Sequence, residues 1–243
     1  MAPDLNALAP GSSLQRNGLN HQAIEDYLKT IYMLEQDKSP VSTSRIADAR
    51  QVKPGSVTSM IQRLNRLNLV NYEKHYGVTL TDAGREIALE VIRHHRLVEL
   101  YLIEALGFGW DEVHQEADIL EHVISEQLEE RIAAALNNPE FDPHGDPIPS
   151  KEGQIASMNY KHLTALDPGA RAVVSRIPDD ADSELLRYLG DLGLIPGTKL
   201  MVLDVAPFDG PLTVEIDGES KIIGHKVASS VLVELKSEFG RSR

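Results

Sequence analysis

Imidazole and carboxylate groups recur at helical spacing between residues 114 and 122. The apolar pattern of residues 111–136 predicts one helix there, and this helix carries Asp118, Glu121 and His122. Positions three and four apart share a face of an α-helix, so these three side chains can converge on one point. His114 lies one turn earlier. The spacing therefore indicates a cluster of nitrogen and oxygen ligands.

A second pair of such groups lies on the preceding predicted helix, which runs from a cap at Thr81 and Asp82 to about Leu106. His95 and Glu99 are four residues apart and share a face of that helix. Two antiparallel helices that each present histidine and carboxylate groups are a common way to build a metal site in a helical domain. Two solvated polar faces are the alternative, but complementary sets on adjacent helices favour the metal site.

The composition limits the chemistry of such a site. The chain has 243 residues, which predicts two or three domains, and it has no cysteine. Disulfides, thiolate zinc sites and a cysteine nucleophile are excluded, so a metal must bind His, Asp, Glu or carbonyl ligands. No apolar run approaches the roughly 20 residues that span a bilayer, and residues 1–18 lack the pattern of a signal peptide. We therefore expect a soluble, cytoplasmic protein with no membrane partner.

The formal charge of −13 argues at first against a nucleic-acid partner, because phosphate neutralisation supplies much of DNA affinity. Its distribution changes this interpretation. Between residues 41 and 74 only Asp48 and Glu73 are acidic. The same segment contains the basic residues Arg45, Arg50, Lys53, Arg63, Arg66 and Lys74. This locally cationic segment is compatible with DNA binding.

The cationic segment has the pattern of a winged helix-turn-helix. Apolar residues at helical spacing predict a helix over residues 20–35 and a shorter helix capped by Ser42 or Thr43. A break before Pro54 precedes another helical run. Residues 70–80 contain two short strands around a turn, which predict the hairpin that forms the wing.

The helix that begins near Pro54 would enter a groove of double-stranded DNA. The residues that we expect to face the DNA come from this helix and the wing: Lys53, Ser56, Thr58, Ser59, Gln62, Lys74 and His75. Hydroxyl, amide and basic side chains can contact phosphates or base edges. For Ser56 a helix cap is the alternative role, and Arg63 and Arg66 can equally be solvated helix residues.

The remainder of the chain changes from helical to strand patterning. A proline-rich stretch ends at about residue 149, and short alternating strands follow from Pro168. They predict a small five-stranded barrel. We therefore expect a mainly α protein with a small β domain. Its predicted parts are a disordered tail (1–18), a DNA-binding domain (19–82), a helical domain (83–150), a linker (151–166) and the barrel (167–243).

Several segments resemble the diphtheria toxin repressor family of metal-dependent transcriptional regulators. Residues 93–99 and 113–123 are similar to the metal-binding helices of that family. Residues 27–32 are similar to its first helix, and residues 145–149, Gly-Asp-Pro-Ile-Pro, to its linker motif. The resemblance extends over about residues 20–236. It implies a winged helix-turn-helix, a helical metal-binding and dimerisation domain, and an SH3-like C-terminal barrel.

The resemblance also implies two metal sites by position. The primary regulatory site would be formed by Asp26, Asp118, Glu121 and His122, and the ancillary site by His95, Glu99 and His114. Iron-sensing members have methionine and cysteine where Asp26 and Asp118 stand, whereas manganese sensors have acids. Carboxylate oxygens suit manganese, while sulfur ligands suit softer ions. The expected cofactor is therefore Mn²⁺, with Fe²⁺ as the alternative.

Two positions depart from the family pattern. Lys29 stands where manganese sensors have a glutamate that helps to hold a second ion, which argues against a tightly coupled two-ion site. Ile177 aligns near the ancillary glutamate of the C-terminal domain, and this leaves Asp179, Asp180 or Asp182 as weaker candidate ligands.

These features predict a homodimeric repressor of metal homeostasis that binds a palindromic operator when a cation links Asp26 to its ligands in the helical domain. We expect the dimer interface on the helices between Glu86 and Leu136. One alternative is a winged-helix regulator of an organic ligand. Another is a metallohydrolase with Glu116 or Glu121 as base, but the sequence has no nucleophile motif that supports an enzyme.

Overall fold

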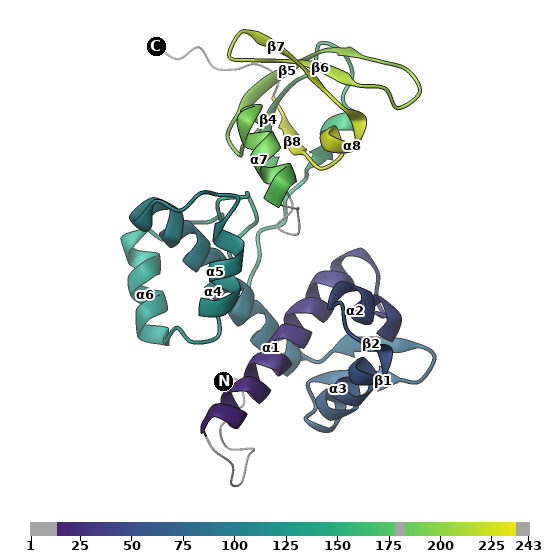
Figure 1. Cartoon of the computed structure of the whole chain (residues 1–243), viewed down its shortest axis with the longest axis vertical. Helices are drawn as coiled ribbons and strands as arrows, with labels where there is room; N and C mark the ends of the chain where they lie inside the picture. Colours follow the sequence, from purple (N-terminus) through teal and green to yellow (C-terminus); the bar gives the residue numbers. More distant parts are fainter. Residues whose placement is uncertain (1–13, 178–182, 237–243) are drawn as a thin grey trace. The chain divides into compact units, whose positions relative to one another are not determined.

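The computed structural model describes residues 14–177 and 183–236 (Figure 1). The chain divides into two compact units. The first comprises Met1–His95, Glu121–Ile124 and Pro149–Gln154, and the second comprises Arg96–Leu120, Ser125–Ile148 and Ile155–Arg243. Within the described residues, no helix combines the length and the apolar character that crossing a membrane requires.

The first unit begins with the helices of the predicted helix-turn-helix: α1 (Leu14–Asp37), α2 (Thr43–Ala49) and α3 (Pro54–Arg66). Ser42 is the N-cap of α2, because its Oγ accepts the backbone N–H of Arg45 at 3.2 Å. The helices pack through side chains that are fully buried: Leu28, Ile31, Ile46, Ile61 and Leu64. Helical spacing of apolar residues therefore predicted this core, although α1 begins earlier than residue 20.

The start of α3 is determined by a proline. Pro54 occupies the first helical turn and Lys53 is the N-cap. Backbone N–H groups in the first turn have no acceptor within the helix, so proline, which lacks an N–H, costs no hydrogen bond there. Ser56 therefore lies inside the helix, and the alternative that it is the cap is wrong. The wing follows as β1 (Val70–Glu73) and β2 (Gly77–Leu80), which pair antiparallel.

Of the two long helices that were predicted beyond the wing, one is continuous and the other is interrupted. The first is α4 (Asp82–Leu106), which contributes residues to both units. The second is not continuous, since it divides into α5 (Val113–Leu120) and α6 (Glu126–Ala135). Ser125 has an extended backbone and caps α6 by accepting a backbone N–H at 3.3 Å. The prediction of one helix is therefore wrong, and residues 121–124 are not helical.

The C-terminal part of the second unit is a small antiparallel β domain. Among the described residues its six strands follow the order β3-β8-β4-β5-β6-β7, one strand more than the five that were predicted. They are β3 (Lys161–His162), β4 (Arg171–Arg176), β5 (Lys199–Val205), β6 (Leu212–Ile216), β7 (Glu219–Ile223) and β8 (Leu232–Leu235). The short helices η2 (Leu163–Ala165), α7 (Ser183–Asp191) and α8 (His225–Ala228) complete the domain, which begins inside the predicted linker.

Alternation of apolar residues builds the core of this domain. Buried residues alternate with less buried ones along β6 and over the first parts of β4 and β5: Ala172 and Val174, Leu200 and Val202, and Leu212, Val214 and Ile216. This is the pattern of a pleated strand with one covered face. Leu163 and Leu189, from η2 and α7, are fully buried in the same core. The sheet and its helices therefore share one core within the described residues 161–177 and 183–236.

The loop before this domain is held by buried charges. Asp142 Oδ1 accepts the backbone N–H groups of His144 and Asp146 at 2.9 and 2.8 Å. Arg96 donates to Asp146 Oδ1 at 3.0 Å, and Arg176 of β4 lies 2.8 Å from the same oxygen. These contacts fix the Gly-Asp-Pro-Ile-Pro segment against the end of β4.

Gly145 of this segment should be intolerant of any side chain. It has φ +86°, and an added Cβ would lie 1.9 Å from the backbone oxygen of Ser175. Gly169 has φ +88° and nothing within 4 Å of an added Cβ, so it isolates the cost of the backbone conformation alone. We expect Gly145→Ala to lower the free energy of unfolding by about 3 kcal/mol or more, and Gly169→Ala by about 1 kcal/mol. Urea unfolding of both variants tests this, and equal losses would contradict it.

Candidate metal centre

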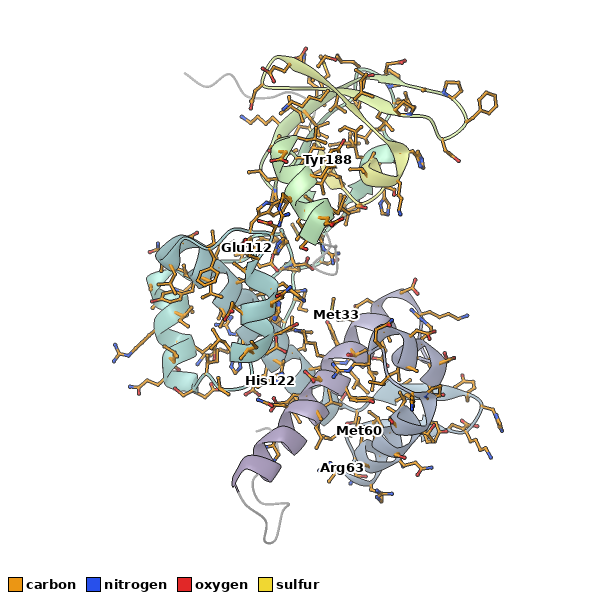
Figure 2. All side chains as sticks on the ribbon, in the orientation of Figure 1. Met33, Met60, Arg63, Glu112, His122 and Tyr188 are labelled. Carbon is orange, nitrogen blue, oxygen red and sulfur yellow. The ribbon has the colours of Figure 1, made fainter. Side chains whose placement is uncertain are left out.

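Three of the four residues predicted for the primary site converge within the first unit. Asp26 comes from α1, and Glu121 and His122 come from the non-helical segment, with one ligand atom of each within 4.8 Å of the others. His122 Nε2 lies 3.1 Å from Asp26 Oδ1 and 3.4 Å from Glu121 Oε1. Figure 2 labels the side chain of His122. Ligands about 2.1 Å from one cation lie roughly 3 to 3.5 Å apart. These two distances are therefore those expected between ligands of a single divalent ion.

An ammonium group belongs to the same cluster. Lys29 Nζ lies 2.7 Å from Glu121 Oε2 and 3.1 Å from His95 Nδ1. His95 Nδ1 is in turn 2.5 Å from the same oxygen of Glu121. One oxygen of Glu121 thus contacts lysine and His95, while the other faces His122. Within the first unit, His95 therefore also contacts the primary cluster, and its assignment to the ancillary site stays a prediction.

Two residues that sequence reasoning did not assign to the site orient its ligands. Glu25 Oε2 accepts a hydrogen bond from His122 Nδ1 at 2.6 Å, so the Nε2 of that ring is directed at Asp26. Arg50, which ends α2, donates to Asp26 Oδ2 at 2.8 Å, and its guanidinium lies 5.2 Å from the ring centre of Tyr27. Such outer partners fix the orientation of metal ligands. The sequence signals were the position of Glu25 beside Asp26 and the place of Arg50 in the cationic segment, and neither indicated a contact with the metal ligands.

The electrostatics of the cluster reflect its acidic ligands. Burial lowers the pKa of His122, but hydrogen bonds to Asp26 and Glu25 and the charge of Glu121 outweigh it and raise the pKa to about 9. For Asp26, burial raises the pKa, but the hydrogen bond to His122 and the charge of Arg50 outweigh it and lower the pKa overall. At neutral pH, Asp26 is therefore ionised and His122 protonated. A cation that binds the imidazole must displace a proton.

The other predicted ligands lie in the second unit. Glu99 Oε1 of α4 is 3.3 Å from His114 Nδ1 of α5, and His114 Nε2 is 3.6 Å from Asp118 Oδ2. Asp118 is thus placed beside His114, and its assignment to the primary site stays a prediction.

Ile177, which aligns near the ancillary glutamate of the family's C-terminal domain, is fully buried. The weaker candidates lie outside the described residues: Asp179, Asp180 and Asp182.

The residues predicted to face DNA lie on α3 and the wing. Those with exposed side chains are Lys53, Ser56, Ser59, Gln62, Lys74 and His75. Thr58 is half-buried and its hydroxyl donates to the Pro54 carbonyl at 3.1 Å, which makes it the weakest candidate. Ser56, Ser59 and Gln62 are spaced by three residues and share one face of α3. This face and the wing form an exposed polar surface.

Comparisons with known proteins agree with this architecture. Residues 21–78 match the family described as iron dependent repressor, N-terminal DNA binding domain, and residues 81–150 match its metal binding and dimerisation domain. Residues 161–235 match the FeoA domain. The iron-dependent repressor IdeR of Mycobacterium tuberculosis is 34% identical over 222 residues, which cover 86% of this chain and 96% of the relative.

Solved structures add a second group of relatives. A manganese-dependent transcriptional repressor in complex with manganese is 39% identical, with a TM-score of 0.81 over 88% of this chain and 100% of that one. The manganese regulator SloR is 34% identical, with a TM-score of 0.69 over 88% of this chain and 98% of that one. The winged helix, the helical domain and the histidine–carboxylate cluster define a metal-regulated, DNA-binding transcriptional repressor. The chain belongs to the iron-dependent repressor family, which includes the diphtheria toxin repressor.

Proposed function

We propose that Mn²⁺ is the activating ion of this repressor and that it binds Asp26, Glu121 and His122, with Asp118 as the fourth ligand by family resemblance. The observation that carries the proposal is the convergence of an α1 carboxylate with the 121–122 pair, whose ligand atoms lie within 4.8 Å of one another. Two carboxylates and one imidazole form an oxygen-rich set that suits manganese, and Fe²⁺ is the alternative.

The ion would act by linking two segments that are distant in sequence. Asp26 lies on the helix whose Leu28 and Ile31 pack into the core of the DNA-binding domain. A cation shared with Glu121 and His122 offsets repulsion between carboxylates and ties α1 to the segment that follows α5. We infer that the ion thereby selects the arrangement in which two recognition helices of a homodimer meet a palindromic operator.

The test is a DNA-binding titration of chelator-treated protein with Mn²⁺, Fe²⁺, Co²⁺ and Zn²⁺. The probe is a duplex selected from a random pool in the presence of manganese. When the free concentration of each ion is buffered to its level in the cell, we expect Mn²⁺ to increase the affinity for DNA more than the other ions do. Binding that is unaffected by every metal would contradict the proposal and favour an organic effector. The relatives named above are repressors, and we propose a regulatory, cytoplasmic role for this chain rather than an enzymatic one.

The proposed DNA surface separates two kinds of contact. If Lys74 contacts phosphate, Lys74→Ala should weaken binding on all sequences and reduce the salt slope by about one unit. Gln62→Ala on the exposed face of α3 should instead change the sequence preference, because amide groups can read base edges. Fluorescence anisotropy at several salt concentrations, on selected and scrambled duplexes, distinguishes them. Identical changes for the two variants would contradict the assignment.

A further inference from the structure

The carboxylate of Asp26 has two sides, and only one of them faces the proposed metal ligands. Oδ1 lies 3.1 Å from His122 Nε2, whereas Oδ2 accepts a hydrogen bond from Arg50 at 2.8 Å. Arg50 ends α2, and its guanidinium also lies 5.2 Å from the ring centre of the buried Tyr27. A planar guanidinium that pairs with a carboxylate and lies over an aromatic ring has a defined orientation. A cation bound at Oδ1 would therefore share Asp26 with the end of α2.

The turn between α2 and α3 begins at Arg50 and is exposed. Gln51, Val52 and Lys53 all have exposed side chains. Gln51 has φ +52°, which residues other than glycine, asparagine and aspartate rarely adopt, and such a conformation persists where surrounding contacts determine it. The Val52 N–H bonds back to the carbonyl of Ala47 at 3.0 Å. The Arg50 side chain ties the same turn to α1, at the residue proposed to bind the ion.

This turn determines how α3 is presented to DNA. Lys53, three residues after Arg50, is the N-cap of α3. The N-terminal residues of a recognition helix are those that meet base edges in the major groove. The exposed Ser56 and Ser59 belong to that part of α3. A displacement of the turn would therefore displace the proposed DNA-contacting face.

The wing is attached to α1 by a different contact. The carboxylate of Glu35, whose side chain is 6% exposed, accepts the backbone N–H of Leu80 in β2 at 3.1 Å. Its other oxygen lies 3.3 Å from a guanidinium nitrogen of Arg85 in α4. Leu80 pairs with Val70 of β1, so this contact holds both strands of the wing. Loss of Arg50 should therefore leave the wing in place.

We propose that Arg50 is a positioning residue that transmits occupancy of the primary site to the recognition helix. An ion at Oδ1 fixes the carboxylate of Asp26, and Arg50 holds the turn before α3 against Oδ2 of the same carboxylate. The proposal deepens the proposed function and rests on it, since it takes Asp26 as a metal ligand. Allosteric regulation is a coupling free energy between two sites, and this contact is assigned a share of that coupling.

Arg50→Leu in the full-length protein is the test. The readout is the factor by which saturating Mn²⁺ raises affinity for the selected duplex, measured by fluorescence anisotropy. We expect this factor to fall at least about tenfold, which is within the usual range of allosteric coupling. Mn²⁺ affinity without DNA should change less than about threefold, because loss of a neighbouring positive charge favours the ion while loss of carboxylate orientation opposes it.

Mn²⁺ affinity is measured by electron paramagnetic resonance of the free ion, in the Glu99→Gln background so that the predicted ancillary site does not contribute. A parallel loss of metal affinity and DNA response would show that Arg50 only shapes the metal site, and would overturn the proposal. An unchanged factor in folded Arg50→Leu protein would also overturn it.

Arg45→Leu is the matched control. Arg45 of α2 pairs with Asp37 of α1 at 2.7 Å, so this variant removes an arginine–aspartate pair between the same two helices, away from the cluster. The factor should stay within about twofold of the wild-type value. Any contact of either arginine with phosphate acts with and without metal, and therefore cancels in the factor.

A conservative pair of variants covers the case in which Arg50→Leu does not fold. Arg50→Lys keeps a positive charge that can pair with Asp26, whereas Arg50→Gln has a similar length and no charge. We expect Arg50→Lys to retain most of the metal-induced factor and Arg50→Gln to lose it. Equal, wild-type factors for the two variants would overturn the proposal.

The separate attachment of the wing supplies a further readout. In the Arg50→Leu background, Lys74→Ala should keep its full effect on the salt slope, because Glu35 still holds the wing. The effect of Gln62→Ala on sequence preference should become smaller, because α3 is no longer positioned. Equal reduction of the two effects would indicate a general disturbance of the domain and would contradict the assignment.

Failure of this proposal is distinguishable from failure of the proposed function. The proposed function fails if Mn²⁺ does not raise the DNA affinity of the wild-type chain. The role of Arg50 fails if the wild-type chain responds to Mn²⁺ and Arg50→Leu responds by the same factor.

Discussion

Asp26→Ala is expected to abolish metal-dependent operator binding while the protein remains folded. Asp26 is the ligand that α1 contributes to the cluster with Glu121 and His122. Without it, an ion held by the other two residues no longer links that helix to the 121–124 segment. We expect the DNA affinity at saturating Mn²⁺ to fall roughly 100-fold, to the level of the metal-free protein. Fluorescence anisotropy with the selected duplex measures this loss.

The matched control lies on the same helix. Asp37 is exposed at the end of α1 and pairs with Arg45 at 2.7 Å, so Asp37→Ala removes an equal charge away from the cluster. Surface ion pairs contribute little, and we expect less than about a twofold change in affinity. Thermal unfolding verifies that both variants fold. If Asp26→Ala bound the duplex with wild-type affinity and wild-type dependence on manganese, the primary-site assignment would be wrong.

Lys29→Glu is expected to change the number of ions that the primary cluster holds. The ammonium of Lys29 lies 2.7 Å from Glu121 Oε2 and 3.1 Å from His95 Nδ1, so it occupies ligand atoms that a second cation would need. Exchanging a positive for a negative charge at this distance should raise Mn²⁺ affinity at least about tenfold, even after allowance for solvent screening. We expect the wild-type cluster to bind one ion and the variant to bind two.

A graded series makes this result interpretable. Lys29→Leu removes the charge without adding a ligand, so affinity should rise while the cluster still binds one ion. Lys38→Glu, at an exposed position just beyond α1, makes the same charge exchange away from the cluster and should leave the stoichiometry unchanged. Calorimetric titration in the Glu99→Gln background removes the contribution of the predicted ancillary site. One ion at wild-type affinity in both Lys29 variants would show that the ammonium does not compete with metal.

The sequence by itself was sufficient for features that depend on local pattern. Apolar residues at helical spacing predicted the helix-turn-helix, and the structure buries them. Pro54 predicted the start of α3, because proline is favoured in the first turn of a helix. Alternating apolar residues predicted the C-terminal strands. The absence of cysteine confined any metal to nitrogen and oxygen ligands. Residue types and short-range spacing carry this information because secondary structure and ligand chemistry depend on neighbours along the chain.

Only the tertiary structure decided how these residues combine. Spacing on one long helix placed Asp118 with Glu121 and His122, but the cap at Ser125 separates α5 from α6. Glu121 contacts Lys29 of α1, which is 92 residues away in sequence, and the place of Asp118 in the primary site stays a prediction. Arg50 was counted only as part of the cationic segment, because nothing near it in sequence reveals that its guanidinium contacts Asp26 of α1. Helical periodicity relates positions a few residues apart, whereas a metal ligand set is selected by packing between segments that periodicity does not connect.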